Sequence, residues 1–188
     1  MTIPDLSTRQ GLPDALRVLL ADYPREGWQT HRHFDGLVRF WLERHLNFRH
    51  LTALMQTETQ ALLDRTRDPR DFAARLGQIG SHFVGDLHGH HQIEDQHYFP
   101  LLAETEPRLR RGFDMLDADH HALDSHIARF VDSANATLSR WQAPDLRDHA
   151  ATFLASLDGL TALLDRHLVD EEDLIVPVIL AHGPGRLG

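Results

Sequence analysis

The chain has 188 residues, of which 41% are hydrophobic and 25% charged, as is typical of one soluble globular domain. Its net charge of −9 and its pI near 5.9 argue against a nucleic-acid backbone or an anionic membrane as a partner, because either would need a basic face. Cysteine is absent, which excludes disulfides, thiolate nucleophiles, iron–sulfur clusters and cysteine-bound zinc, so any metal would be bound by imidazole and carboxylate groups.

The first residues, MTIPDLSTRQ, contain no basic stretch followed by an apolar one, and 18 consecutive apolar residues occur nowhere. We therefore expect a cytoplasmic protein without a membrane segment. The chain has 15 histidines but only 2 tyrosines and 3 tryptophans, and this excess asks for an explanation from the positions of the histidines.

Proline, glycine and helix-capping residues divide the chain into segments whose apolar residues recur every three or four positions, as in an all-α protein. Residues 12–23 are expected to form a short helix that Pro24 and Gly27 end. Long helices are expected at residues 30–65, 68–103, 108–141 and 144–182.

The loops between the four long helices are short, which favours an antiparallel up-down four-helix bundle. We expect the bundle to span residues 30–182. Residues 1–29 would form an N-terminal segment with the short extra helix, and residues 183–188 a C-terminal tail.

Two of the predicted helices carry the same motif. His90 and Glu94 in the second helix correspond to His167 and Glu171 in the fourth, within the shared pattern H-x-x-x-E-[DE]-x-x-x-x-P. A spacing of four places the imidazole and the carboxylate on one helix face about a turn apart, as two ligands of one metal site require.

Histidines in the other two helices are expected at the same level of the bundle. The midpoints between consecutive members of the series His45, His90, His120 and His167 fall near residues 67, 105 and 143, at the turns predicted from proline and caps. Residues equidistant from the turn of an antiparallel hairpin lie side by side. The predicted metal ligands are therefore His45, His90, Glu94, His120, His167 and Glu171.

Six such ligands amount to a site for two ions, which the two glutamates are able to bridge. Burying two carboxylates costs several kcal/mol each unless they are paired or bound to metal. Imidazole and carboxylate without thiolate suit iron, manganese or zinc.

These motifs resemble those of the hemerythrin-like, or HHE cation-binding, family. The resemblance rests on His45, on the two H-x-x-x-E motifs with the prolines that follow them, and on Asp119 with His120, and it covers roughly residues 30–182. It implies an oxo- or hydroxo-bridged pair of iron ions with two bridging carboxylates.

The chain departs from the oxygen-carrying hemerythrins, which place H-x-x-x-H on the third helix. Asp124 stands four residues after His120 here, and the fourth helix offers Glu171. The chain is more similar to a subgroup linked to iron sensing, oxidative and nitrosative stress and repair of iron centres. One imidazole fewer leaves a more open iron, which favours reaction with oxygen, peroxide or nitric oxide over reversible oxygen carriage.

Three functions stay open at this point. The first is a di-iron protein that reacts with or senses O2, NO, peroxide or iron. The second is an oxidoreductase that consumes peroxide or oxidises a substrate, with Tyr98 and His97 as electron and proton relays. The third is a metal-free helical interaction module. The sequence does not determine the metal or the oligomeric state.

Three neighbouring histidines compete with two of the predicted ligands. A small helix rotation would bring His50, His121 or His126 inward in place of His45 or His120.

Other polar residues near the motifs have predicted roles outside the ligand set. His97 is expected either to deliver protons or to lie on the surface, and Asp86 is a candidate to orient the imidazole of His90. Asp95 and Glu172, which follow the ligand glutamates, are expected to face solvent or a basic residue.

Overall fold

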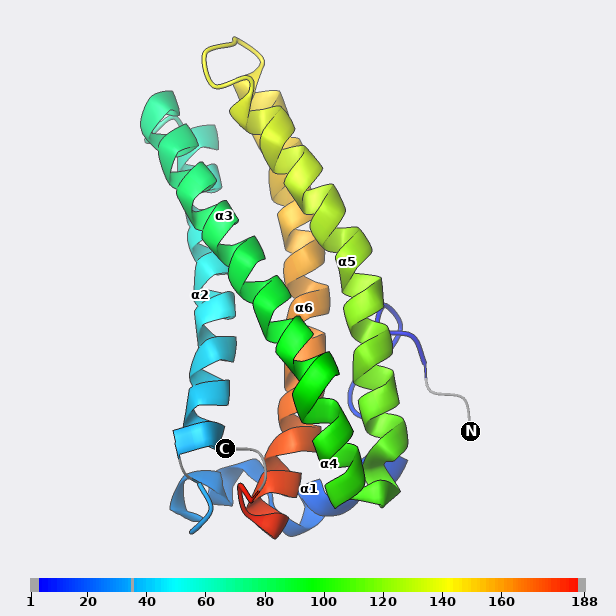
Figure 1. Cartoon of the computed structure of the whole chain (residues 1–188). Coiled ribbons are helices and arrows are strands. Elements are labelled where there is room, and N and C mark those ends of the chain that lie inside the picture. Colours follow the sequence, from blue (N-terminus) through cyan, green and yellow to red (C-terminus); the bar gives the residue numbers. More distant parts are fainter. Residues whose placement is uncertain (1–3, 35, 186–188) are drawn as a thin grey trace. The chain divides into compact units, whose positions relative to one another are not determined.

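The computed structural model describes residues 4–34 and 36–185, and these are helical for the most part (Figure 1). Helices make up 82% of the structure, and the described residues contain no strand, which confirms the predicted all-α class. Residues 1–3 of the predicted N-terminal segment and residues 186–188 of the predicted tail lie outside the described residues. No helix in the described ranges is long and apolar enough to cross a lipid bilayer.

The helix predicted at residues 12–23 is divided into two short elements. A 3-10 turn, η1 (Asp14–Leu16), precedes α1 (Val18–Asp22), and Arg17 between them leaves the helical region with φ −87° and ψ 8°. Pro24 ends α1 because its ring disfavours helical backbone at the residue before it. A second 3-10 segment, η2 (Arg25–Thr30), follows.

The long helices occur where the sequence predicts them, with shifted ends. The first, predicted from residue 30, is α2 (Gly36–Leu63), because the η2 turn occupies residues 25–30 and His31 is extended. The third and fourth are α5 (Arg110–Leu138), which follows the turn η4 (Pro107–Leu109), and α6 (Leu146–His182).

The second predicted helix is a helical run in three parts: α3 (Pro69–Ile93), the π-helical turn η3 (Glu94–Tyr98) and α4 (Phe99–Thr105). The Phe99 N–H donates to the carbonyl of Glu94, five residues back. Pro100 has no N–H, and in a regular α-helix its ring would meet the carbonyl four residues before it, so the wider turn accommodates it. Such turns are frequent at functional sites, and this one begins at a predicted ligand.

The chain forms two compact units. Unit 1 comprises the described residues within 1–46, 90–122 and 165–188, and unit 2 comprises residues 47–89 and 123–164. All six predicted ligands belong to unit 1.

Each unit has its own apolar core. In unit 1, buried side chains of the N-terminal segment pack with those of the long helices; the segment contributes Leu12, Leu16, Leu19 and Trp28. In unit 2, four buried phenylalanines pack edge-to-face or tilted, one after another, with ring centroids 5.5–6.3 Å apart; they are Phe48, Phe83, Phe130 and Phe153.

One glycine permits a close approach of two helices in unit 1. A Cβ atom at Gly112 on α5 would lie 2.7 Å from Cδ2 of Leu174 on α6. Leu174 is 1% exposed, so it has little room to move. Glycine at residue 112 therefore determines how closely α5, which carries His120, packs against α6, which carries His167 and Glu171.

Candidate metal centre

Seven buried side chains of unit 1 form two groups of metal-ligand type. We call the first the glutamate cluster; it contains His45, His90, Glu94 and Glu171. We call the second the histidine cluster; it contains His91, His120 and His167. Within each group, one ligand atom per residue lies within 4.8 Å of the others.

The structure brings together all six residues that the sequence singles out. Of the three rivals, His50 and His121 are exposed and His126 is half-buried, and none of them belongs to either cluster. His120, rather than its neighbour His121, points inward. His97 is exposed, in keeping with the second of its two predicted alternatives.

Each glutamate presents one oxygen to each cluster. Glu94 Oε1 lies 3.0 Å from Nε2 of His90, and its Oε2 lies 3.6 Å from Nε2 of His120. Glu171 Oε1 lies 3.3 Å from Nε2 of His45, and its Oε2 lies 3.4 Å from Nε2 of His167. Two carboxylates thus span the space between the same two groups of imidazoles.

The outer nitrogens of three imidazoles donate to carboxylates. The Nδ1–H of His45 donates to Glu172 at 3.0 Å. The Nδ1–H of His120 donates to Asp95 at 2.7 Å. The third such bond runs from Nδ1 of His167 to Asp119 over 3.5 Å. A neutral imidazole that carries its proton on Nδ1 has a lone pair on Nε2, so these bonds turn the lone pairs toward the glutamates.

The inner nitrogens face one another in pairs. Nε2 of His45 lies 3.1 Å from Nε2 of His90, and Nε2 of His120 lies 3.1 Å from Nε2 of His167. Two ligand atoms that bind one ion at about 2.1 Å and about 90° to each other lie about 3.0 Å apart. The spacing of the nitrogens is that of neighbouring ligands on one cation.

Several buried polar atoms at this site accept or donate no hydrogen bond among the described residues. They are both carboxylate oxygens of Glu94, Oε2 of Glu171 and both ring nitrogens of His91. Buried polar groups without partners are rare because each costs about 1–3 kcal/mol or more. A pair of cations would satisfy the oxygens and one nitrogen of His91, so the donor set fits metal.

The pKa values of the buried groups respond to the crowding of charge. Burial and the neighbouring charge of Glu171 raise the pKa of Glu94 well above its ordinary value. Burial alone would also raise the pKa of Glu171, but His45 and His167 outweigh it and the pKa falls well below the ordinary value. Without metal, one carboxylate of the pair therefore takes up a proton while the other stays ionised.

The pKa values of the histidines are likewise lowered for some and raised for others. Burial lowers the pKa of His90 to about 3 and that of His91 well below 6.5. Burial alone would lower the pKa of His167 too, but the hydrogen bond to Asp119 and the negative charges of Asp119 and Glu171 raise it to about 9. In the metal-free protein a proton on His167 takes the place of a cation.

Comparison with known proteins places this constellation in a family. The hemerythrin HHE cation-binding domain matches residues 36–179, which is most of the chain. The chain belongs to the hemerythrin HHE cation-binding domain family. A search of curated proteins and a search of solved structures gave no match.

Sequence reasoning missed one member of this HHE site. His91 is 5% exposed, and its ring stacks on that of His120 with the centroids 3.9 Å apart. The pair of adjacent histidines at residues 90 and 91 was the available indication, because neighbouring helical residues point about 100° apart and so are able to serve two ions on different sides.

The partners of the imidazoles also differ from expectation. Asp95 and Glu172 accept hydrogen bonds from His120 and His45, so the expectation that both face only solvent or a basic residue was incomplete. Asp86 lies 3.6 Å from Nε2 of His82 on its own helix, and its role in orienting the imidazole of His90 stays a prediction. Asp95 and Glu172, each next in sequence to a predicted ligand glutamate, thus accept hydrogen bonds from imidazoles on other helices.

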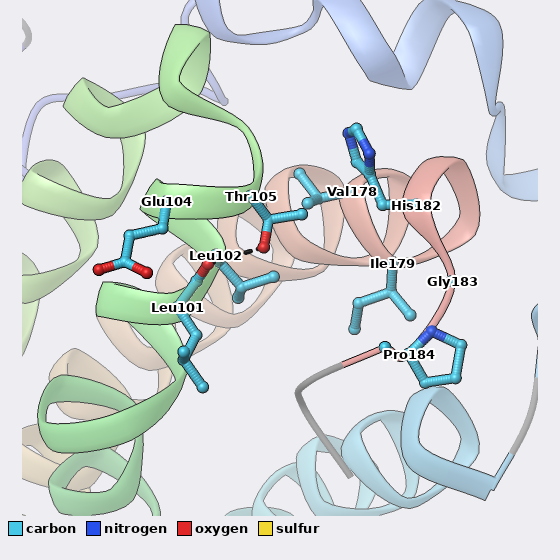
Figure 2. A pocket seen from close by; sticks show the side chains of 10 residues that line it. Leu101, Leu102, Glu104, Thr105, Val178, Ile179, His182, Gly183 and Pro184 are labelled. Atoms are coloured by element: carbon cyan, nitrogen blue, oxygen red, sulfur yellow. Dashed lines mark hydrogen bonds between the residues drawn. The ribbon is translucent and has the colours of Figure 1, made fainter.

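The hollow in Figure 2 is separate from the HHE site. It measures about 370 Å³ and lies between the ends of α4 and α6 in unit 1. Its walls include Leu101, Thr105, Ile179 and His182, and no cluster residue contributes to it. The two clusters are instead enclosed by protein.

Proposed function

We propose that this protein binds two iron ions and uses them to react with or sense O2, NO, peroxide or the supply of iron. Glu94 and Glu171 would bridge the ions, and the observation that carries the proposal is that each glutamate presents one oxygen to each cluster. The proposal includes the antiparallel up-down four-helix topology predicted from the sequence.

Counting ligand atoms supports a reactive pair. The ion in the glutamate cluster would have four protein ligands, from His45, His90 and one oxygen of each glutamate. The other ion would have five, from the histidine cluster and the remaining oxygens. Iron commonly binds six ligands, so both ions would keep room for an outside ligand.

The protein's own contribution is to prepare and enclose this site. Asp95, Asp119 and Glu172 orient imidazoles through Nδ1, which raises their basicity as ligands. Burial of Glu94, Glu171 and the ligand histidines limits the entry of water and of large molecules, which favours small diatomic ligands and peroxide.

Anaerobic reconstitution tests the proposal. The protein is expected to bind two Fe(II) per chain and, on exposure to air, to develop the near-ultraviolet charge-transfer bands of a bridged ferric pair. Glu94→Gln removes a bridging carboxylate and should abolish the bands. Glu104→Gln, an exposed residue farther along the same helical run, is the control. Absence of the bands in the unaltered protein, or bands unchanged in Glu94→Gln, would count against the bridged pair.

A second candidate function, an oxidoreductase, is favoured by an aromatic connection from the site toward the surface. Trp41 donates its indole N–H to Glu171, and its ring centroid lies 4.8 Å from that of Tyr98. The Tyr98 centroid lies 5.2 Å from that of the exposed His97. These rings offer a path for single electrons between the buried site and a donor outside.

The oxidoreductase would reduce peroxide to two molecules of water with two electrons and two protons. Iron bound by the two clusters would supply the redox chemistry, and Tyr98 and Trp41 would pass the two electrons, one at a time, from an external one-electron reductant to the site. Steady-state peroxide consumption with such a reductant is expected to fall in Trp41→Phe and Tyr98→Phe while iron content stays at two per chain. If the unaltered protein does not consume peroxide, the oxidoreductase function is refuted and only the binding or sensing function remains.

The third alternative, a metal-free interaction module, makes the opposite prediction. Protein purified from its own host would then contain no stoichiometric iron, manganese or zinc, and removal of metal would leave its stability unchanged.

A further inference from the structure

The described part of the N-terminal segment, residues 4–29, lies before the residues that match the HHE family and contributes two arginines next to the metal centre. Both arginines bind carboxylates that in turn accept hydrogen bonds from ligand histidines. All the residues concerned belong to unit 1.

Arg9 serves the histidine cluster. Its side chain is 2% exposed, its Nε–H donates to Asp170 at 2.7 Å, and its two terminal nitrogens donate to both oxygens of Asp119. Asp119 also accepts the Nδ1–H of His167. The chain of contacts is therefore Arg9, Asp119, His167, metal position.

Arg25 serves the glutamate cluster. One terminal nitrogen donates to Oε2 of Glu172 at 2.8 Å, and its Nε–H donates to Asp173 at 2.7 Å. The guanidinium also lies 4.9 Å from the ring centroid of Trp28. The other oxygen of Glu172 accepts the Nδ1–H of His45, so the chain of contacts is Arg25, Glu172, His45, metal position.

We propose that Arg9 and Arg25 are positioning residues for the two metal positions, one for each, and that the N-terminal segment is thereby a working part of the metal centre. This inference rests on the proposed function. The N-terminal segment anchors both arginines through buried apolar side chains, of which Leu12, Leu16 and Trp28 belong to the core of unit 1.

The physical reason is geometry combined with charge. The fork of Arg9 binds both oxygens of Asp119, and Arg25 binds one oxygen of Glu172, so each arginine restricts the direction in which its carboxylate accepts a further hydrogen bond. The positive charge of the arginine also weakens the effect of the carboxylate on the imidazole. The basicity of the inner nitrogen, and so its affinity for a cation, depends on this balance. Loss of the arginine would leave the carboxylate free to turn and the imidazole poorly oriented.

The contacts of Arg9 and Arg25 differ in burial, so different substitutions suit the two residues. Arg9 has a buried, forked contact, whereas the Arg25 side chain is 40% exposed. Removing a buried partner leaves an uncompensated charge and threatens folding, so Arg9→Lys, which keeps the charge but loses the fork, is the suitable change there. Arg25→Gln is expected to leave the fold intact, because water reaches this residue and is able to solvate the carboxylates that lose the arginine.

The experiment uses the full chain loaded with Zn²⁺, which is diamagnetic and allows the imidazole nitrogens to be observed by NMR. Arg25→Gln is expected to shift the Nδ1 signals of His45 and to leave those of His167 in place, and Arg9→Lys is expected to do the reverse. Competition with a chelator is expected to show one of the two zinc affinities weakened up to about tenfold in each variant, since changes to the carboxylates themselves typically cost 10–100-fold.

Arg17→Gln is the matched control. Arg17 lies in the same segment with its side chain 47% exposed, and its ion pair is with Asp14, 3.5 Å away and also exposed. It should bind zinc as the unaltered protein does. Histidine signals and zinc affinities that are unchanged in both Arg9→Lys and Arg25→Gln would overturn the inference, as would equal changes in Arg17→Gln.

The outcome also separates this inference from the proposed function. If the unaltered protein binds no pair of ions, the metal centre itself is refuted and the inference with it. If the unaltered protein binds two ions and the arginine variants bind them equally well, only the role of the N-terminal segment is refuted.

Discussion

Nε2 of His120 and Nε2 of His167 lie 3.1 Å apart in the interior of unit 1. The Nδ1–H of each ring already donates to a carboxylate, Asp95 for one and Asp119 for the other. If both rings are neutral, two lone pairs face each other, which is unfavourable until a proton or a metal ion lies between them. The two imidazoles therefore favour the presence of either a proton or a metal ion between their Nε2 atoms.

Metal is accordingly expected to stabilise the fold strongly. A ligand that binds only the folded state stabilises it by about 4 kcal/mol at a thousand times its dissociation constant. For a chain of this size that corresponds to about 8–16 °C in melting temperature. Thermal unfolding of chelator-treated protein with and without added Zn²⁺ measures the difference, and Glu171→Gln should reduce it. Equal melting temperatures with and without metal would contradict the proposed centre.

His91 is expected to bind one of the two ions. In His91→Ala, one of the two metal affinities should fall by at least about tenfold while the other stays close to that of the unaltered protein, because His91 belongs to the histidine cluster alone. His121→Ala, a change at an exposed ring on α5, is the control. Chelator competition measures both constants. Two unaltered affinities in His91→Ala would show that its burial serves packing against His120.

Metal affinity is expected to rise with pH. The pKa of His167 is about 9 in the metal-free fold, so a metal ion must displace its proton at lower pH. Affinity should therefore rise at least about tenfold per pH unit between pH 6 and pH 9, and more steeply where Glu94 or His45, whose pKa values are also raised, loses its proton as well. His90, whose pKa is about 3, is neutral throughout and adds nothing. Chelator competition across this range tests the slope, and a flat profile would contradict the protonation of His167.

The same shift affects the stability of the metal-free protein with the opposite sign. Because the folded pKa of His167 is raised above 6.5, its contribution to the free energy of unfolding is fully present below pH 6.5 and is lost as the pH rises through about 9. Chemical denaturation of metal-free protein at pH 6.5 and pH 9 measures this. In His167→Gln the loss between these pH values should be smaller.

Gly112→Ala is expected to destabilise the protein by about 1 kcal/mol or more, since the added Cβ would lie 2.7 Å from the buried Leu174. Gly159→Ala on α6 is the matched control, because its Cβ would meet nothing within 4 Å. Alanine is the better helix former, so Gly159→Ala should stabilise by about 0.5–1 kcal/mol. Denaturant unfolding compares the two, and a stabilised Gly112→Ala would show that Leu174 moves aside without cost.

Local regularities carried the prediction of the all-α fold and of the six candidate ligands. Helical periodicity and prolines located the long helices, and the spacing of four within each H-x-x-x-E motif put an imidazole and a carboxylate on one face. The constant rise of a helix made distance from the turn a guide to level, so His45 and His120 were found without a motif of their own. The up-down topology of the whole bundle stays a prediction.

Contacts between segments far apart in the sequence were determined only by the tertiary structure. Whether His91 points inward depends on the rotation of α3, and the break at Arg17 between η1 and α1 was not predicted from the periodicity of residues 12–23. Arg9 meets Asp119 across 110 residues of sequence and Arg25 meets Glu172 across 147, and no periodicity relates positions so far apart. The six candidate ligands follow from spacing within helices and from distance to the turns, because both depend on regular helix geometry. The contacts of Arg9 and Arg25 follow from the path of the N-terminal segment, which only packing against the core determines.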